Sequence, residues 1–466
     1  MATIIEQQPL YDTLPVGQEV IFTVSNTNIV ATFVGVKIIA EVRISSSNPP
    51  NPSSAANVVG TFKTTPNNAG VGMFDFRPVI ENFVKSENIA YDWAEYKGGS
   101  SIYVPFSLHL IDKFARSVNT IRYLAINFTT EYIDSAGDLI VDNTEDNSIA
   151  FKVFNGYLKY TEQLDLIGNN FGFNTNSFQL QNALIGGQFL TNAPTTQYAN
   201  IEDYGTLSFL STPVSGNETA TTLSYIKLAM YDDSGVIIGS AIQIDNTSSN
   251  GGFDVWSSNI KKQMLFFGCF PGNLRNWSAS FVSALPTLSY YTVQAYNVSN
   301  VQISDEITIN INCPTLKGFE PIRLTWLNQW GGWDYYTFKM KSTKSIKTKG
   351  STYQQLEGSW NERIYNIDSY KGGKKSFRVN ATEKIKMNTD FVNESESAWF
   401  EELINSPEVY ILEGFREDSE YSALNKYVTP VRLTTSSYTK KTIANDKVMQ
   451  YTFEIEKTKT LRTQSI

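Results

Sequence analysis

Histidine and cysteine are nearly absent from this sequence, which has one histidine, His109, and two cysteines, Cys269 and Cys313, in 466 residues. A Ser-His-Asp or Cys-His catalytic site would have to use His109, because activation of a hydroxyl or thiol normally needs an imidazole. His109 lies in the alternating apolar stretch "YVPFSLHLIDKF", which is typical of a sheet position. Zinc sites built on two or more imidazoles are excluded. We interpret the cysteines as buried thiols, with a single bridge between them as the alternative.

Motifs for binding phosphates and calcium are also missing. The sequence has no GxxxxGK[ST] loop, no GxGxxG opening a helix and no D-x-[DN]-x-[DN]-G loop. We therefore expect no cofactor, no metal ion and no enzymatic activity. A pair of carboxylates, as used in glycoside hydrolysis, is the one catalytic device that 46 Asp and Glu residues leave open.

Long apolar runs are lacking as well. The sequence has no run of the roughly 18 apolar residues that a membrane helix needs, so we expect no membrane span. The N-terminal stretch "MATIIEQQPLYDTLPVGQ" has no basic segment followed by an apolar run, so we also expect no secretory signal. These absences favour a protein that is made and kept in a cytoplasm, or released without the usual secretion route.

The charge is unevenly divided along the chain. Residues 1–313 have a net charge of −12 and residues 314–466 a net charge of +4. We interpret this as two domains with different solvated faces, and head-to-tail docking between copies or against a partner is the alternative. Because the whole chain is acidic, we do not expect nucleic acid as a partner.

The sequence is rich in residues that favour strands, with 13 % aromatics and many short alternating runs between turn residues. We predict a mainly β protein with two β-sandwich-like domains, residues 1–170 and 185–313. A β-barrel-like or α+β domain, residues 314–466, follows and carries one short amphipathic helix. The clearest strand signal is apolar alternation at Val36, Ile38, Ala40, Val42 and Ile44.

Two pairs of similar segments suggest that the second sandwich is a duplicate of the first. "GMFDFRPVIENFV" (72–84) resembles "GFDVWSSNIKKQM" (252–264), and "YIDSAGDLI" (132–140) resembles "YDDSGVII" (231–238). The alternative is that both similarities are coincidences of β-hairpin chemistry.

The stretch "IRLTWLNQWGGWDYYTFKMK" (322–341) contains the candidate interface or ligand aromatics. We predict two strands joined through "NQWGG", with aromatics on both faces of the second strand, so that both faces are covered. We favour a hairpin built for packing over a platform that stacks sugars, because each buried aromatic contributes a large apolar area. The candidates are Trp326, Trp330, Trp333, Tyr335 and Tyr336.

Lysines follow this hairpin at strand spacing. A lysine-lined strand is commonly a protected sheet edge, so we predict a basic edge that is solvated or faces an interface. A ribbon that binds phosphates beside aromatic faces is the alternative. The candidate edge residues are Lys339, Lys341, Lys344, Lys347 and Lys349.

The clearest helix in the sequence covers residues 394–405. Asn393 is a plausible N-cap and Glu396 completes a capping box. A shorter helix is predicted from Pro78 to Phe83. In the longer helix one apolar stripe, predicted to face the core, is formed by Trp399, Phe400, Leu403 and Ile404.

Several of these stretches resemble structural proteins of tailed bacteriophages and prophages of Bacteroidetes hosts. They are "GVGMFDFRPVI" (70–80), "FLTNAP" (189–194), "RLTWLNQWGGWDYYTF" (323–338) and "AWFEELINSPEVYIL" (398–412). The resemblance covers the last third of the chain best and the first two-thirds only in style. It brings no catalytic motif, so it implies a role and not a reaction.

The resemblance implies a virion component, made in the host bacterial cytoplasm, from the tail, baseplate or collar/ring region. It would act by self-assembly into a ring or similar homo-oligomer and by docking to other virion proteins, with the third domain as the docking module. Truncation at Pro314 would then leave a soluble first part that no longer enters particles. The alternative is a carbohydrate- or receptor-binding protein that uses the Trp-rich hairpin to bind a host surface glycan. A polysaccharide-degrading enzyme with a carboxylate pair comes third.

Overall fold

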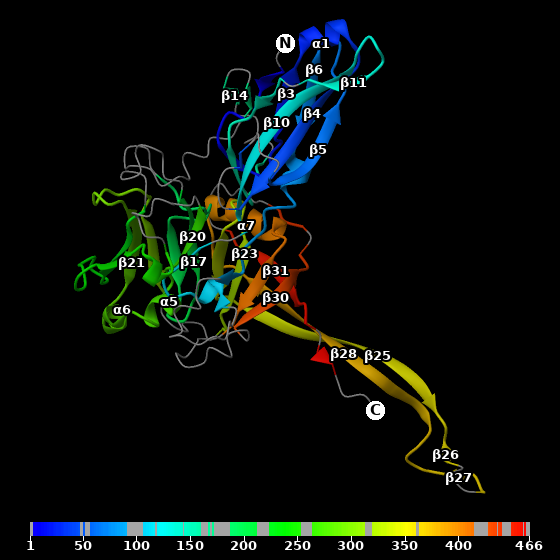
Figure 1. Cartoon of the computed structure of the whole chain (residues 1–466). Helices are drawn as coiled ribbons and strands as arrows, with labels where there is room; N and C mark the ends of the chain where they lie inside the picture. The colour runs from blue at the N-terminus through cyan, green and yellow to red at the C-terminus, as the bar shows by residue number, and fades with distance from the viewer. Residues whose placement is uncertain are drawn as a thin grey trace. The chain divides into compact units, whose positions relative to one another are not determined.

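The chain is mainly β, as predicted, and its contacts divide it into two compact units (Figure 1). Unit 1 contains the described residues up to 312 together with 327–334, and unit 2 contains 319–326 and those from 335 onward. The structure is a computed structural model that describes residues 3–46, 50–51, 56–90, 106–116, 119–142, 144–159, 166–167, 170–171, 187–211, 223–252, 263–312, 319–359, 363–413, 427–435, 437–439, 449–459 and 461–462.

The first part of unit 1 is a β-sandwich. One sheet has the order β1-β3-β6, and the other has the order β2-β13-β10-β4-β5, with β11 and β12 also paired to β10. The short helix α2 overlaps the helix predicted from Pro78 to Phe83. The elements are β1 Ile4–Gln7, β2 Thr13–Pro15, β3 Ile21–Ser25, α1 Thr27–Thr32, β4 Val34–Ser45, β5 Val58–Thr64, β6 Val71–Asp75, α2 Arg77–Ile80, β10 Ile121–Ile133, β11 Leu139–Val141, β12 Asp146–Asn147 and β13 Phe151–Phe154.

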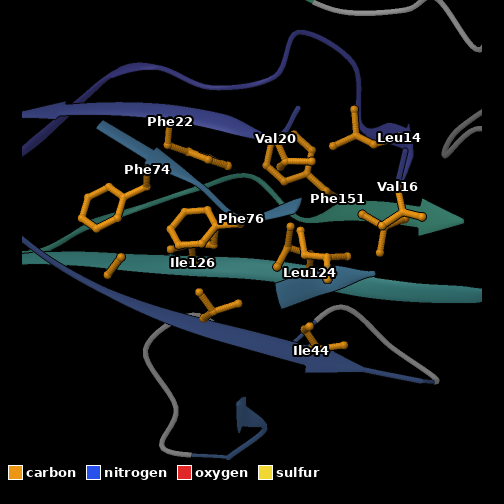
Figure 2. Close-up of a cluster of buried hydrophobic side chains, with 14 of the residues drawn as sticks. Leu14, Val16, Val20, Phe22, Ile44, Phe74, Phe76, Leu124, Ile126 and Phe151 are labelled. Atoms are coloured by element: carbon orange, nitrogen blue, oxygen red, sulfur yellow. The ribbon is translucent and has the colours of Figure 1, made fainter. Parts of the chain in front are cut away.

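Both sheets contribute one face to a common apolar core (Figure 2). All five apolar positions predicted on one face of β4, from Val36 to Ile44, are buried, and Ile39 and Arg43 between them are buried as well. Phe22 of β3 lies among three other rings, with centroids 5.6 Å from Phe76, 5.6 Å from Phe128 and 5.7 Å from Phe151. The tilted and edge-to-face arrangements are those that aromatic pairs prefer.

The second part of unit 1 has two larger sheets, with the orders β16-β22-β21-β18-β19 and β17-β20-β9. Two strand pairs, β7-β8 and β14-β15, stand apart from them. The elements are β7 Ile89–Ala90, β8 Phe106–Ser107, η2 Leu108–Leu110, β9 Phe114–Arg116, β14 Leu166–Ile167, β15 Asn170–Phe171, β16 Thr196–Ala199, β17 Thr206–Ser211, β18 Tyr225–Tyr231, β19 Ile242–Asp245, η4 Ser248–Asn250, β20 Gln263–Gly268, α5 Pro271–Arg275, α6 Ala279–Ala284, β21 Tyr290–Tyr296 and β22 Ile307–Ile311.

Strand pairing crosses the boundary that the sequence analysis places between residues 170 and 185. Strand β9 comes from the first sequence block but pairs with β20 of the second. The Asn273 side chain holds the same segment, since its Nδ2 donates to the carbonyl oxygens of His109 at 3.1 Å and Ile111 at 2.7 Å. Residues of both blocks therefore belong to one compact unit, and a division into two sandwich domains stays a prediction.

One turn geometry occurs four times in unit 1, where three of the turns close hairpins and the one at Asn67 joins β5 to β6 of different sheets. In each, an Asp or Asn side chain accepts hydrogen bonds from the backbone N–H groups two and four residues later, and the residue three positions later has a positive φ. Glycine or asparagine occupies that position, because these residues tolerate the left-handed region best. The first residues of the four turns are Asn67, Asp134, Asp232 and Asn297.

This turn accounts for one of the two similarities that suggested a duplication. "YIDSAGDLI" (132–140) and "YDDSGVII" (231–238) both contain it, but so do the turns that begin at Asn67 and Asn297. The shared turn therefore explains this similarity without a duplication. The second pair includes residues 253–262, which lie outside the described residues, so the duplication stays a prediction.

Unit 2 is built on an eight-stranded sheet with the order β24-β23-β29-β30-β31-β28-β25, in which β32 also pairs with β28. Its described strands run from β24 to β25 without closing, so the α+β alternative describes this unit and the barrel does not. The elements are β23 Ile322–Leu327, β24 Trp333–Phe338, β25 Ser342–Gln355, β26 Gly358–Ser359, β27 Asn366–Ile367, β28 Gly373–Asn388, α7 Glu394–Asn405, β29 Val409–Leu412, β30 Val428–Leu433, β31 Thr452–Lys457 and β32 Leu461–Arg462.

The sandwich core of unit 1 predicts unequal effects for two truncations on paired strands. Phe22→Ala removes a ring that is fully buried and should lower the free energy of unfolding by about 3–5 kcal/mol. Met73→Ala, on the neighbouring strand β6, removes a side chain that is 62 % exposed and should change it by less than about 0.5 kcal/mol. Urea denaturation measures both values, and equal losses would contradict this core.

Candidate functional site

The aromatic hairpin β23–β24 is closed by the same turn that occurs four times in unit 1. The Asn328 side chain accepts from the backbone N–H of Trp330 at 3.0 Å and of Gly332 at 2.9 Å, and Gly331 has φ +73°. The predicted joint "NQWGG" is therefore confirmed. Residues 327–334, which we call the hairpin tip, belong to unit 1, whereas the rest of both strands belongs to unit 2.

The backbone of the hairpin tip lies directly against other segments of unit 1. The Tyr157 N–H donates to the carbonyl oxygen of Gln329 at 2.9 Å. A Cβ atom at Gly331 would stand 1.9 Å from the Asn155 carbonyl oxygen, and one at Gly332 would stand 2.6 Å from Ser208 Oγ. Glycine is needed at both positions because the backbones approach too closely for a side chain.

The tryptophans of the hairpin tip are buried, and their ring N–H groups are used inside unit 1. Trp330 Nε1 donates to Asn192 Oδ1 at 3.1 Å, and Trp333 Nε1 donates to the Glu87 carbonyl oxygen at 2.8 Å. The His109 ring stands edge-to-face against Trp333, with centroids 4.8 Å apart. Both indoles are 2 % exposed, so neither offers a ring face to a ligand.

Polar side chains also hold the hairpin tip in place through hydrogen bonds within unit 1. Asp334 is buried and accepts hydrogen bonds from Thr191 Oγ1 at 2.6 Å and Asn328 Nδ2 at 2.9 Å. Asn328 Nδ2 also donates to the Leu190 carbonyl oxygen at 2.7 Å. Buried hydrogen bonds to a charged group are among the stronger ones, so this network fixes the tip in place.

The other three candidate aromatics lie in unit 2. Trp326 is fully buried, with its ring centroid 5.0 Å from that of Trp399 in α7. Tyr335 is buried beneath the Arg323 guanidinium, whose Cζ is 5.3 Å from the ring centroid. The Tyr336 hydroxyl accepts from the Asp390 N–H at 3.0 Å, and burial raises the pKa of this phenol well above its usual value.

The predicted helix is confirmed as α7, including its capping box. The Asn393 side chain accepts from the Glu396 N–H at 2.9 Å, and Glu396 Oε2 accepts from the Asn393 N–H at 2.8 Å. In the predicted apolar stripe Trp399, Phe400 and Leu403 are buried, and Ile404 is half-buried. Phe400 contacts the rings of β24 and β31, so the helix covers one face of the sheet.

The structure thus divides the five candidate aromatics between the cores of two units. Trp330 and Trp333 belong to unit 1, and Trp326, Tyr335 and Tyr336 belong to unit 2. Both faces of β24 are covered, as the aromatic pattern predicts. The five side chains do not form one exposed surface.

The predicted basic edge corresponds to strand β25 and the residues before it. This strand ends the path of the eight-stranded sheet and, among the described strands, pairs only with β28. Lys344 forms an ion pair with Glu320 at 2.8 Å, and Lys339 forms one with Asp390 at 3.2 Å. Lys341, Lys347 and Lys349 are exposed, so the lysines line a solvated edge.

A projecting ribbon in the same strands is a surface that the sequence analysis missed. Figure 1 shows β25 and β28 leaving the sheet together, with β26 and β27 at the far end. We call residues 346–379 the arm. Beyond Asn380 no third described strand pairs with this ribbon, and most of its residues are exposed. The sequence signal that could have indicated this surface is the set of isolated apolar residues among lysines and turns.

Other candidate features give no site. Cys269 is buried, and Cys313 lies outside the described residues. In the part of the chain that the structure describes, no group of three His, Cys, Asp or Glu residues is placed to hold a metal ion. Among the same residues, no helix is long and apolar enough to cross a membrane.

Comparisons with known proteins leave the family open. No family model matches the sequence, and no curated protein matches it. The cryo-EM structure of native Escherichia coli α2-macroglobulin is 8 % identical, with a TM-score of 0.19 over 83 % of this chain and 22 % of that chain. The trypsin-activated E. coli protein is 7 % identical, with a TM-score of 0.17 over 97 % of this chain and 23 % of that chain. The methylamine-reacted Salmonella protein is 8 % identical, with a TM-score of 0.18 over 97 % of this chain and 22 % of that chain. The chain spans less than a quarter of these proteins, and such TM-scores carry no argument about fold or function.

Two glycines with nearly the same positive φ test how closely the hairpin tip approaches the rest of unit 1. Gly331 has φ +73° and Gly373 has φ +72°, but nothing lies within 4 Å of a Cβ at Gly373. Gly373→Ala should cost about 1 kcal/mol of stability, from backbone strain alone. Gly331→Ala adds a collision with Asn155 and should cost several kcal/mol. Denaturant unfolding measures both, and equal costs would contradict the buried tip.

A conservative change at Trp333 separates a packing role from a glycan-binding role. Trp333→Phe keeps a ring but leaves the Glu87 carbonyl oxygen without its donor, so we expect a loss of about 1–3 kcal/mol in stability. Binding to an array of host surface glycans should be the same for wild type and variant. Loss of glycan binding at unchanged stability would show that this ring contacts a sugar.

Proposed function

We propose that this protein is a structural component of a tailed-phage virion, in the tail, baseplate or collar/ring region. It acts by binding copies of itself and other virion proteins and carries out no reaction. The protein is made in the host bacterial cytoplasm and works in the assembled particle.

The observation that carries this proposal is that one of the four stretches resembling phage structural proteins, residues 323–338, contacts two of the others in the fold. In "FLTNAP", three residues form hydrogen bonds with the hairpin tip, which belongs to "RLTWLNQWGGWDYYTF". They are Leu190, Thr191 and Asn192. In unit 2 the latter stretch pairs with "AWFEELINSPEVYIL", since Arg323 of β23 is registered with Leu412 of β29. The resemblance therefore falls on packed neighbours, which supports a shared architecture.

The exposed surface of unit 2 also supports a protein that works in an assembly. The arm carries seven large apolar side chains that are exposed to solvent. A neighbour in a virion would cover them. The glycan alternative has no comparable support, because its three tryptophans, Trp326, Trp330 and Trp333, are buried.

The proposal is tested on phage particles released from a Bacteroidetes strain that carries the gene. We expect mass spectrometry of gradient-purified particles to detect the protein at a fixed ratio to the major tail proteins. Deleting the gene should give particles with incomplete tails, and the wild-type gene supplied in trans should restore them. Intact, infectious particles that lack the protein would refute the proposal.

The whole chain is needed for complementation. Truncation at Pro314 would remove residues 327–334, which are part of unit 1, so the remaining fragment would lose the hairpin tip from its core. A failure of that fragment to enter particles would not separate docking from misfolding. Point variants on the surface of the full chain avoid this problem.

A further inference from the structure

The arm combines an apolar surface with positive charge. Its far end is held by its own contacts, since β26 pairs with β27 and Lys371 forms an ion pair with Asp368 at 2.8 Å. The arm contains seven Lys and Arg against three Asp and Glu. Its exposed large apolar residues, each at least 44 % exposed, are Ile346, Leu356, Ile364, Tyr365, Ile367, Tyr370 and Phe377.

A surface of opposite charge and similar apolar character lies on the sandwich of unit 1. The hairpin of β10 and β11, residues 131–142, contains four acidic residues and no basic one. Glu131 is buried and ion-paired with Lys63 at 2.5 Å, but Asp138 is exposed and its side chain makes no interaction in the described structure. We call residues 131–142 the acidic hairpin.

The acidic hairpin exposes apolar side chains beside these charges. Every residue of β11 is exposed, with Leu139 at 62 % and Val141 at 51 %, and Val34 across the sheet is 69 % exposed. Among the described strands β11 pairs only with β10, so its outer edge has no strand partner. A short apolar edge of this kind is a ready surface for another chain.

We propose that the arm of one copy binds the acidic hairpin of a second copy. The apolar side chains of both surfaces bury each other, and the lysines and arginines of the arm face the carboxylates around the acidic hairpin. This inference rests on the proposed function, and it names the partner and the two surfaces of self-assembly.

The contact joins two different surfaces, so it is heterologous. Each copy in it offers one arm and one acidic hairpin, and head-to-tail contacts of this type close into a ring or extend as a filament. A copy with a defective arm still presents its acidic hairpin, and a copy with a defective acidic hairpin still presents its arm. A mixture of the two can therefore form one productive contact per pair.

The test is sedimentation velocity of the full-length chain over a concentration series, with negative-stain images of the same samples. Wild type should form multimers. Ile367→Ser in the arm and Leu139→Ser in the acidic hairpin should each weaken association at least about tenfold. Mixing these two variants should restore dimers. The charge reversals Lys374→Glu and Asp138→Lys should each weaken association, and the two combined in one chain should recover it.

Matched controls come from the second hairpin with the same turn. Ile237 corresponds to Leu139 in that turn and is 55 % exposed, so Ile237→Ser should leave association unchanged. Because all substituted side chains are exposed, thermal melts of the variants should match wild type. A variant that melts early would be replaced by Ile364→Ser, at another exposed site of the arm.

Several results would overturn the inference. The first is a wild-type protein that stays monomeric up to about 100 µM. The second is association that Ile237→Ser weakens and Leu139→Ser does not. The third is a mixture of the two single variants that forms no dimers. Binding of a fluorescent single-stranded DNA that Lys374→Glu abolishes would assign the arm to nucleic acid instead. Virion incorporation is measured separately, so a protein found in particles but monomeric in solution would refute the arm contact and leave the proposed function standing.

Discussion

The rest of the structure depends on the burial of the hairpin tip, residues 327–334, inside unit 1. Two tryptophans, a buried aspartate and a Gly-Gly backbone are held there by segments that are distant in sequence, at Glu87, Asn155 and residues 190–192. Because the same hairpin continues as β23 and β24 of the eight-stranded sheet, the third sequence block contributes residues to both compact units. The tip of its first hairpin is buried in unit 1, and the rest of that hairpin belongs to the sheet of unit 2.

The close approach explains why aromatic residues and glycines occur together in "LNQWGGWDYY". The turn needs Asn328 to accept backbone N–H groups and Gly331 to adopt a positive φ. The packing needs Gly331 and Gly332 because a Cβ would meet Asn155 or Ser208. The indoles then fill the space on either side and donate their N–H groups to buried acceptors. One short stretch therefore serves a turn, a core and a polar network.

The proposed role in a virion follows from surfaces and not from a reaction. The stretches on which the proposed resemblance rests contribute many buried residues to the two units. The surfaces that would contact neighbours are elsewhere, on the arm and on the acidic hairpin, and both combine exposed apolar side chains with charge of one sign. The proposed contacts therefore use parts of the chain that the cores do not need.

The sequence by itself determined the β class, the buried apolar positions of β4, the capped helix α7 and the aromatic hairpin with covered faces, because these depend on local periodicity and capping chemistry. Tertiary structure alone decided which core each aromatic enters, since Trp326 and Trp330 are four residues apart and belong to different units. It also decided the pairing of β9 with β20 and the projection of the arm. Local periodicity does not determine which distant strands pair, and the apolar residues of the arm do not by themselves show that it lacks a third strand, so only the folded chain shows both.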